Sequence, residues 1–307
     1  MPNAMLYSGR LATILGLALL LALPATADTI TLKNGVEVHG NLREIQPGVF
    51  QLETAGRVVV YRADEVARIE ENDRTGGFDI EAAKERARQR DAELTEQTGL
   101  TKAQRDHVRE MLHEYRGADA ARRTQLLEQF KEMQQEVDVF RYIVFYKQAL
   151  SNNIVPPALD ALYTLDPLRS RTVLAEYAQD SYYGNRAKAL QLLGHVGDTQ
   201  YVPLVMRGLA DHELEVQAQA AVALARLGVR EATPAILEVM QRGDVHTRHA
   251  AAQALAALWR DVAGEAVPDT PNAWAAFVSE HQQEISGPVR LAALEPLVAP
   301  HEEFEQE

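Results

Sequence analysis

Apolar positions recur with a period of 31 residues between residues 154 and 258. Gly197 and Gly228 are one period apart, and so are Pro203 and Pro234. Leucines repeat in the same register at Leu162, Leu193, Leu224 and Leu255. A fixed period of this length is typical of stacked supersecondary units.

Each period contains two predicted helices. In the third unit, apolar residues at helical spacing continue to Leu227, and Gly228 is the type of residue that commonly ends a helix. A second helix is expected from about Glu231, with Pro234 in its first turn. Neither helix can bury its apolar face alone. The pairs are therefore expected to stack, over residues 154–285, into a right-handed α-solenoid of about four helix pairs in a mainly α protein.

Two segments, AKALQLLGHVGDTQYVPLV and AAVALARLGVREATPAIL, resemble the HEAT-repeat family in its short bacterial form. The resemblance implies a helical solenoid and says little about chemistry. It also implies a ladder between units, made by an Asp and by an Arg that follows it six residues later. Asp180 and Arg186 keep that spacing, whereas Asp211 is followed by Gln217, so a partial ladder is expected.

The segment 1–27 has the features of a secretory signal peptide. Arg10 precedes an uncharged apolar run, 11–23, which is short for a membrane span. Ala25-Thr26-Ala27 provides small residues for cleavage before Asp28. We therefore expect a periplasmic or secreted protein with no stable membrane insertion after signal cleavage. The alternative is an uncleaved anchor.

Residues 28–71 predict five short strands and, from them, a small all-β, SH3-like barrel. Asn34-Gly35 forms a strong hairpin signal, and Gly40 inside the second strand indicates a bulge or bend. The stretch ITLKNGVEVHGNLREI is similar to the first motif of Sm-like proteins, which bind RNA, but YRADEVARIE does not match their second motif. The barrel is therefore expected to dock a partner or to pack on the helices.

Between the strands and the repeats we expect a linker at 72–79 and a helical connector at 80–153 that caps the solenoid. The longest helical run is predicted over 118–150. Its second half is apolar on nearly every face of the helix, which indicates that this part is buried. The alternative is that its aromatic side chains form an exposed partner site. Residues 286–307 predict a short C-terminal helix followed by an acidic tail.

Composition argues against several classes of function. The net charge of −13 disfavours nucleic acid and anionic membranes as partners. The chain has no cysteine, so a thiolate nucleophile is impossible. It contains no phosphate loop, H-E-x-x-H or G-x-S-x-G motif. The closest metal-like spacings are His246/His249 and Glu110/His113, and surface histidines are the favoured interpretation of both. We therefore expect no cofactor, no metal and no enzymatic activity.

Alignment at the repeat period places a set of polar side chains on one face of successive first helices. The candidate partner-binding residues are Asp160, Tyr163, Lys188, Gln191, His195, Gln219, Arg226, His249 and Gln253. The resemblance implies a groove here, with small residues such as Ala187, Gly194 and Ala218 as its floor. The alternative is a plain solvated face.

These observations favour a non-enzymatic scaffold or adaptor of the periplasm that holds a protein or peptide partner. One alternative is an envelope metal-binding protein or enzyme that uses His246 and His249. Another is a structural accessory subunit of a membrane complex, which would pair through the aromatic helix.

Overall fold

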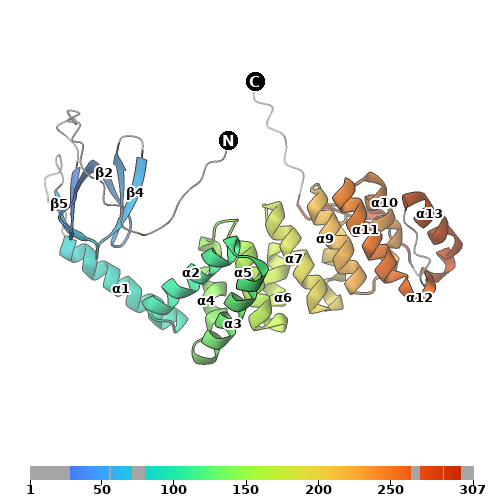
Figure 1. Ribbon diagram of the computed structural model, residues 1–307, viewed down its shortest axis with the longest axis horizontal. Helices are drawn as coiled ribbons and strands as arrows, with labels where there is room; N and C mark the ends of the chain where they lie inside the picture. Colours follow the sequence, from blue (N-terminus) through green and yellow to red (C-terminus); the bar gives the residue numbers. More distant parts are fainter. Residues whose placement is uncertain (1–27, 55–56, 71–79, 264–269, 286, 299–307) are drawn as a thin grey trace, which may run out of the picture. The chain divides into compact units, whose positions relative to one another are not determined.

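The computed structural model describes residues 28–54, 57–70, 80–263, 270–285 and 287–298 (Figure 1). The chain divides into two compact units, Met1–Glu93 and Leu94–Glu307, with the boundary inside helix α1 (Ile80–Thr98). The predicted signal peptide, the 72–79 linker and residues 299–307 of the acidic tail lie outside the described residues. Within the described part, no helix has the length and apolar character needed to cross a membrane.

The first unit is built on a five-stranded antiparallel sheet with the order β4-β3-β2-β1-β5. Its strands are β1 (Asp28–Leu32), β2 (Glu37–Gln46), β3 (Val49–Thr54), β4 (Arg57–Arg62) and β5 (Val66–Glu70). Gly35 takes a φ of +83° in the turn before β2, as the hairpin prediction requires. Gly40 lies where β2 leaves β1 and begins to pair with β3. A Cβ at Gly40 would lie 2.4 Å from the carbonyl oxygen of Glu53, so only glycine allows this approach.

The sheet is not the closed barrel that we expected. Strands β4 and β5 are its two edges, and within the described residues they do not pair with each other. The buried residues of the sheet are Ile30, Leu42, Phe50, Leu52, Val66 and Ile69. Helix α1 adds the buried Ala83 to this cluster, and Arg86 of α1 forms an ion pair with Glu44 at 3.0 Å. Because a helix completes part of the core, the apolar face does not depend on closure of the sheet.

The second unit begins with three helices: α2 (Lys102–Gly117), α3 (Ala120–Glu136) and α4 (Val139–Tyr146). A capping box opens α2, with reciprocal bonds between Thr101 and Gln104 of 3.3 and 2.9 Å. The single long helix predicted over 118–150 is wrong. The chain leaves helical geometry at Val137, and the Asp138 carboxylate then accepts a bond from the backbone N–H of Arg141 at 3.0 Å. An aspartate that caps a new helix start explains the break.

Helix α4 carries the aromatic stretch of the sequence. Phe140 and Tyr142 are buried, and Tyr146 is half-buried and stacks on Tyr142 at 5.8 Å between ring centroids. Phe145 is 47% exposed. The prediction of a buried helix is therefore confirmed for most of α4, and Phe145 is the aromatic residue of α4 that remains open to solvent.

Four helix pairs follow along the chain, as the 31-residue period predicts (Figure 1). They are α5 (Val155–Leu165) with α6 (Pro167–Tyr177), α7 (Tyr183–Val196) with α8 (Val202–Gly208), α9 (Leu214–Arg226) with α10 (Thr233–Arg242), and α11 (Val245–Leu258) with α13 (Pro271–Glu280); the short α12 (Arg260–Ala263) follows α11. The repeated leucines Leu162, Leu193, Leu224 and Leu255 are all buried. Gly197 and Gly228 have φ of +76° and +70° directly beyond their helices, which confirms the predicted helix ends.

Small residues let the first helices of neighbouring pairs approach each other closely. Helix α7 packs along α9, and α9 packs along α11. A Cβ on Gly194 of α7 would lie 2.6 Å from the Cα of Ala223 in α9. Glycine at this position therefore sets the separation of the two helices, because any larger residue would push them apart.

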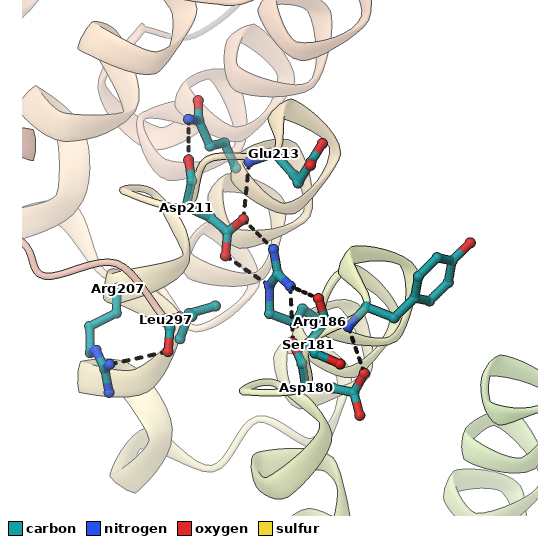
Figure 2. A network of polar contacts seen from close by, with 9 residues as sticks. Asp180, Ser181, Arg186, Arg207, Asp211, Glu213 and Leu297 are labelled. Atoms are coloured by element: carbon teal, nitrogen blue, oxygen red, sulfur yellow. Dashed lines mark hydrogen bonds and ion pairs between the residues drawn. The ribbon is translucent and has the colours of Figure 1, made fainter. Parts of the chain in front are cut away.

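A buried ion pair also joins the second and third pairs (Figure 2). The guanidinium of Arg186 donates to both carboxylate oxygens of Asp211, at 2.9 and 2.7 Å, and to the backbone carbonyls of Asp180 and Ser181, each at 2.9 Å. Gln217 donates to the backbone carbonyl of Asp211 at 2.6 Å. The partial ladder is thus confirmed, and its rung runs from Arg186 to the aspartate of the next unit.

The C-terminal end of the repeats is closed by aromatic side chains. Trp259 and Trp274 are fully buried, and Phe277 meets both rings edge-on, with centroids 5.6 and 5.4 Å away. The indole N–H of Trp259 donates to the hydroxyl of Thr233 at 3.0 Å. These contacts bury apolar surface that the last helix pair would otherwise present to solvent.

Residues 287–298 form one 3-10 turn, Leu291–Ala293, and not the short α-helix that we expected. They return across second helices of the repeats instead. The backbone N–H of Val289 donates to the carbonyl of Glu231 at 2.9 Å, and Arg207 donates to the carbonyl of Pro296 at 3.0 Å. Leu297 is buried near Gly208, and its backbone carbonyl accepts a longer bond from Arg207 at 3.5 Å, which Figure 2 shows. Long-range contacts of this kind override the weak local preference for helix.

Candidate functional site

The nine predicted partner-binding residues lie on the first helices of the four pairs. Asp160 and Tyr163 are in α5; Lys188, Gln191 and His195 are in α7; Gln219 and Arg226 are in α9; His249 and Gln253 are in α11. We call the surface formed by the members in α5, α7 and α9 the first-helix face. His195, Arg226, His249 and Gln253 are exposed, and the other five are half-buried.

A polar cluster joins three helices at one end of the first-helix face. The Lys188 ammonium lies 2.7 Å from one carboxylate oxygen of Asp160, and the Tyr115 hydroxyl donates to the other at 3.0 Å. Lys188 also donates to the amide oxygen of Gln191 at 3.2 Å. The side chains of Lys188 and Asp160 are only 22% and 18% exposed. This ion pair is therefore partly shielded from solvent and orients its members better than a fully exposed pair does.

His195 extends this cluster toward α9. Its ring lies 6.0 Å from the ring of Tyr163, centroid to centroid. Partial desolvation of its ring by neighbouring atoms lowers the pKa of His195, and the positive charges of Arg226 and Lys188 lower it further, against a smaller opposite effect of Asp160. The direction of the pKa shift indicates that His195 is neutral at neutral pH. Arg226 and Lys188 each affect this pKa more strongly than Asp160 does, although the chain carries a net charge of −13.

Arg226 is exposed at the end of α9. Within the described residues its guanidinium has no hydrogen-bond or ion-pair partner. A guanidinium offers a planar set of donors that suits a carboxylate. The first-helix face therefore presents an oriented cation, Lys188, and an accessible cation, Arg226, both of which act on a neutral histidine.

The remaining candidates make contacts within their own helices. Gln219 donates to Glu215 at 2.9 Å, and Gln253 lies 2.9 Å from the Nε2 atom of His249. Their contacts therefore do not connect them with the cluster at Asp160 and Lys188. The geometry supports a site over α5, α7 and α9 more strongly than one extending to α11.

The small residues are not the floor of an open groove. Ala187 is 5% exposed and Ala218 is fully buried, and Gly194 is also buried where α7 approaches Ala223. Their size serves close packing between helices. The implied small-residue floor is therefore wrong, because the helices approach too closely for these side chains to face solvent.

The candidate metal spacings do not converge on one point. His246 lies 3.3 Å from Glu215, whereas His249 contacts Gln253. His113 lines a separate hollow of about 110 Å³ with Arg109, Tyr146 and Leu150. In the ranges that the structure describes, no three His, Asp or Glu side chains are grouped so that they could hold a metal ion.

Tyr115 is the member of the site that the sequence did not predict. It lies in α2, outside the repeats, and its hydroxyl reaches Asp160 across 45 positions of sequence. Burial and the nearby Asp160 carboxylate raise the pKa of Tyr115, so it remains a neutral donor. No periodic signal could identify it, because the capping helices do not share the 31-residue pattern.

Comparison with known families supports the repeat assignment. Residues 171–256 match the family model described as HEAT repeats. The match begins in α6 and ends in α11, so it includes the α7 and α9 residues of the first-helix face. No curated protein sequence matches the chain.

Proposed function

We propose that this chain is a non-enzymatic scaffold or adaptor that binds a protein or peptide partner through the first-helix face. HEAT repeats commonly serve as protein-interaction scaffolds and are typically non-enzymatic, and a match to them covers residues 171–256. The features of segment 1–27 support a periplasmic location. The described residues supply no assembled group for catalysis on this face, so binding is the simpler function.

The observation that carries the proposal is the local positive character of the face around His195. Arg226 and Lys188 both lower the pKa of this histidine, and Arg226 is exposed without a partner in the described structure. Although the chain has a net charge of −13, these two cations reduce the repulsion that an acidic partner segment meets here. The partner is therefore proposed to place a carboxylate against Arg226.

A variant of Arg226 tests the proposal. Arg226→Ala is expected to weaken capture of the partner by more than tenfold, about 1.4 kcal/mol or above. Its thermal midpoint should remain close to that of the parent protein, because Arg226 is exposed. The measurement is affinity capture from periplasmic extract with quantitative mass spectrometry, followed by titration of the captured protein.

Arg248 provides a matched control. It is an exposed arginine on α11, at the repeat position that Arg186 holds in α7. Arg248→Ala should leave capture unchanged. Equal capture by the Arg226→Ala variant and the parent protein would remove this face from the proposed function. A large fall in thermal midpoint would instead assign Arg226 to packing between repeats.

A further inference from the structure

Strand β4 lies at the edge of the sheet and carries exposed apolar residues at positions where polar residues would be expected. Val58, Val59 and Val60 are 56%, 37% and 51% exposed. Strand β4 ends the sheet, and within the described residues it has a neighbour, β3, on one side only. Natural edge strands are usually protected by charge, proline or a bulge. This strand has none of these protections along its three central residues.

The register shows that the valines project to both faces of the sheet. Val59 pairs with the buried Leu52, and Tyr61 pairs with the buried Phe50, so Val59 and Tyr61 lie on the core side. Val58 and Val60 pair with Glu53 and Gln51 and lie on the opposite side. A strand added beside β4 would cover both sets of side chains and would supply the missing backbone partners.

Charge at the two ends of β4 restricts what can be added. Arg57 begins the strand and Arg62 ends it, and their guanidinium groups have no ion-pair partner in the described structure. In an antiparallel pairing of two copies in symmetric register, Arg57 of one β4 would face Arg62 of the other. Like charges opposite each other destabilise a sheet. A segment with an acidic residue at each end is favoured instead.

A hollow adjoins the C-terminal half of β4. It has a volume of about 400 Å³ and is lined by Val60 and Tyr61 of β4, by Leu32, Lys33 and Asn34 at the β1–β2 turn, and by Glu65. Lys33 and Glu65 contribute one cation and one anion to its lining, so the charge preference at β4 rests on Arg57 and Arg62.

We propose that β4 is a docking edge for an extended segment of a partner protein, apolar at its centre and acidic at both ends, which adds a sixth strand to the sheet. This mode uses backbone hydrogen bonds for affinity and alternate side chains for specificity. The proposed site lies in the first compact unit and does not depend on the first-helix face.

The test uses the full-length chain and a fluorescent synthetic peptide, Glu-Val-Thr-Val-Thr-Val-Glu, blocked at both ends. A second peptide has Lys in place of both Glu residues. Fluorescence anisotropy should show at least tenfold tighter binding of the acidic-ended peptide. Hydrogen exchange should show new protection of backbone amides in residues 57–62 when this peptide is bound.

Variants locate the interaction. Val58→Ser combined with Val60→Ser should weaken binding at least tenfold without changing charge, and Arg57→Gln with Arg62→Gln should reduce both the affinity and its dependence on salt. Ile45→Ser is the matched control, because Ile45 is an equally exposed apolar residue of β2, at 49%, away from the free edge. Far-UV circular dichroism should confirm that every variant is folded. Arg226→Ala should bind the peptide as the parent protein does, which separates this proposal from the proposed function.

Three results would overturn the proposal. The first is equal binding of the two peptides. The second is unchanged binding by the double-serine variant. The third is self-association in sedimentation experiments that the double-serine variant abolishes, because the occupant of β4 would then be a second copy of the chain.

Discussion

Removing one member of the buried ion pair between Arg186 and Asp211 should destabilise the protein far more than removing one member of an exposed pair of the same two residue types, because it leaves an unpaired charge buried. Their side chains are only 6% and 1% exposed, and two parallel hydrogen bonds of 2.9 and 2.7 Å join them. Arg186→Met keeps much of the side-chain volume but removes the charge that faces Asp211. Among its described contacts, the buried Asp211 carboxylate would then keep one hydrogen-bond donor, the backbone N–H of Glu213 at 3.0 Å.

The expected loss for Arg186→Met is about 3–5 kcal/mol, which is typical when one member of a buried pair is removed. Asp211→Ala should be similarly severe, because Arg186 then retains only the carbonyls of Asp180 and Ser181. The double variant should lose less than the sum of the two single losses, since it leaves no unpaired charge. Urea unfolding followed by circular dichroism would give these free energies, and hydrogen exchange would show which repeats open first.

The pair between Arg171 and Asp198 is the control. It spans 2.9 Å and also joins two helix pairs, but its side chains are 43% and 20% exposed. Arg171→Met should cost about 0–1 kcal/mol, as exposed pairs do. If Arg186→Met proved no more destabilising than Arg171→Met, the view that burial makes Arg186 a structural link between repeats would be refuted.

Three further predictions concern the core, pH and processing. Leu224→Ala should destabilise the repeats by about 2–5 kcal/mol, because Leu224 is fully buried. Hydrogen exchange in the β-sheet unit should stay unchanged. Exchange that became faster by the same factor in both units would contradict their independence. The pKa of His195 is lowered in the folded state, so its contribution to stability is present above its unfolded pKa of about 6.5 and is lost as pH falls toward the folded pKa. Urea titrations between about pH 7 and pH 5 should therefore show a smaller loss of unfolding free energy for His195→Gln than for the parent protein. An equal loss in both proteins would exclude His195 as a source of the pH dependence. N-terminal sequencing of the mature protein should begin at or near Asp28, and an intact Met1 on cytosolic protein would contradict export.

The repeat architecture was predictable because its signal is local and repeated. Leu193 and Leu224 hold equivalent positions, and Gly197 and Gly228 end equivalent helices, so the period defines both the helices and their buried faces. The strands were predictable for a similar reason: alternation and turn residues such as Gly35 depend on neighbours in sequence. The same period placed Asp160, Lys188, His195 and Arg226 on successive first helices.

The tertiary structure decided which of those side chains act together. Lys188 contacts Asp160, whereas Gln219 and His249 make contacts within their own helices, and helical spacing alone cannot distinguish these outcomes. Tyr115 joined the site from a helix without the repeat pattern. The spacing of Asp180 and Arg186 indicated a ladder, but only packing showed that the carboxylate partner is Asp211.

Closure of the sheet and the path of the C-terminal segment were likewise decided by long-range contacts. Helix α1 supplies Ala83 to the core of the sheet, and within the described residues β4 pairs with a strand on one side only. Residues 287–298 gain buried contacts for Leu297 and a bond from Arg207 by lying along the repeats, which a short isolated helix could not provide. Sequence determined the elements because their preferences are local, and the structure determined their partners because burial depends on residues far away along the chain.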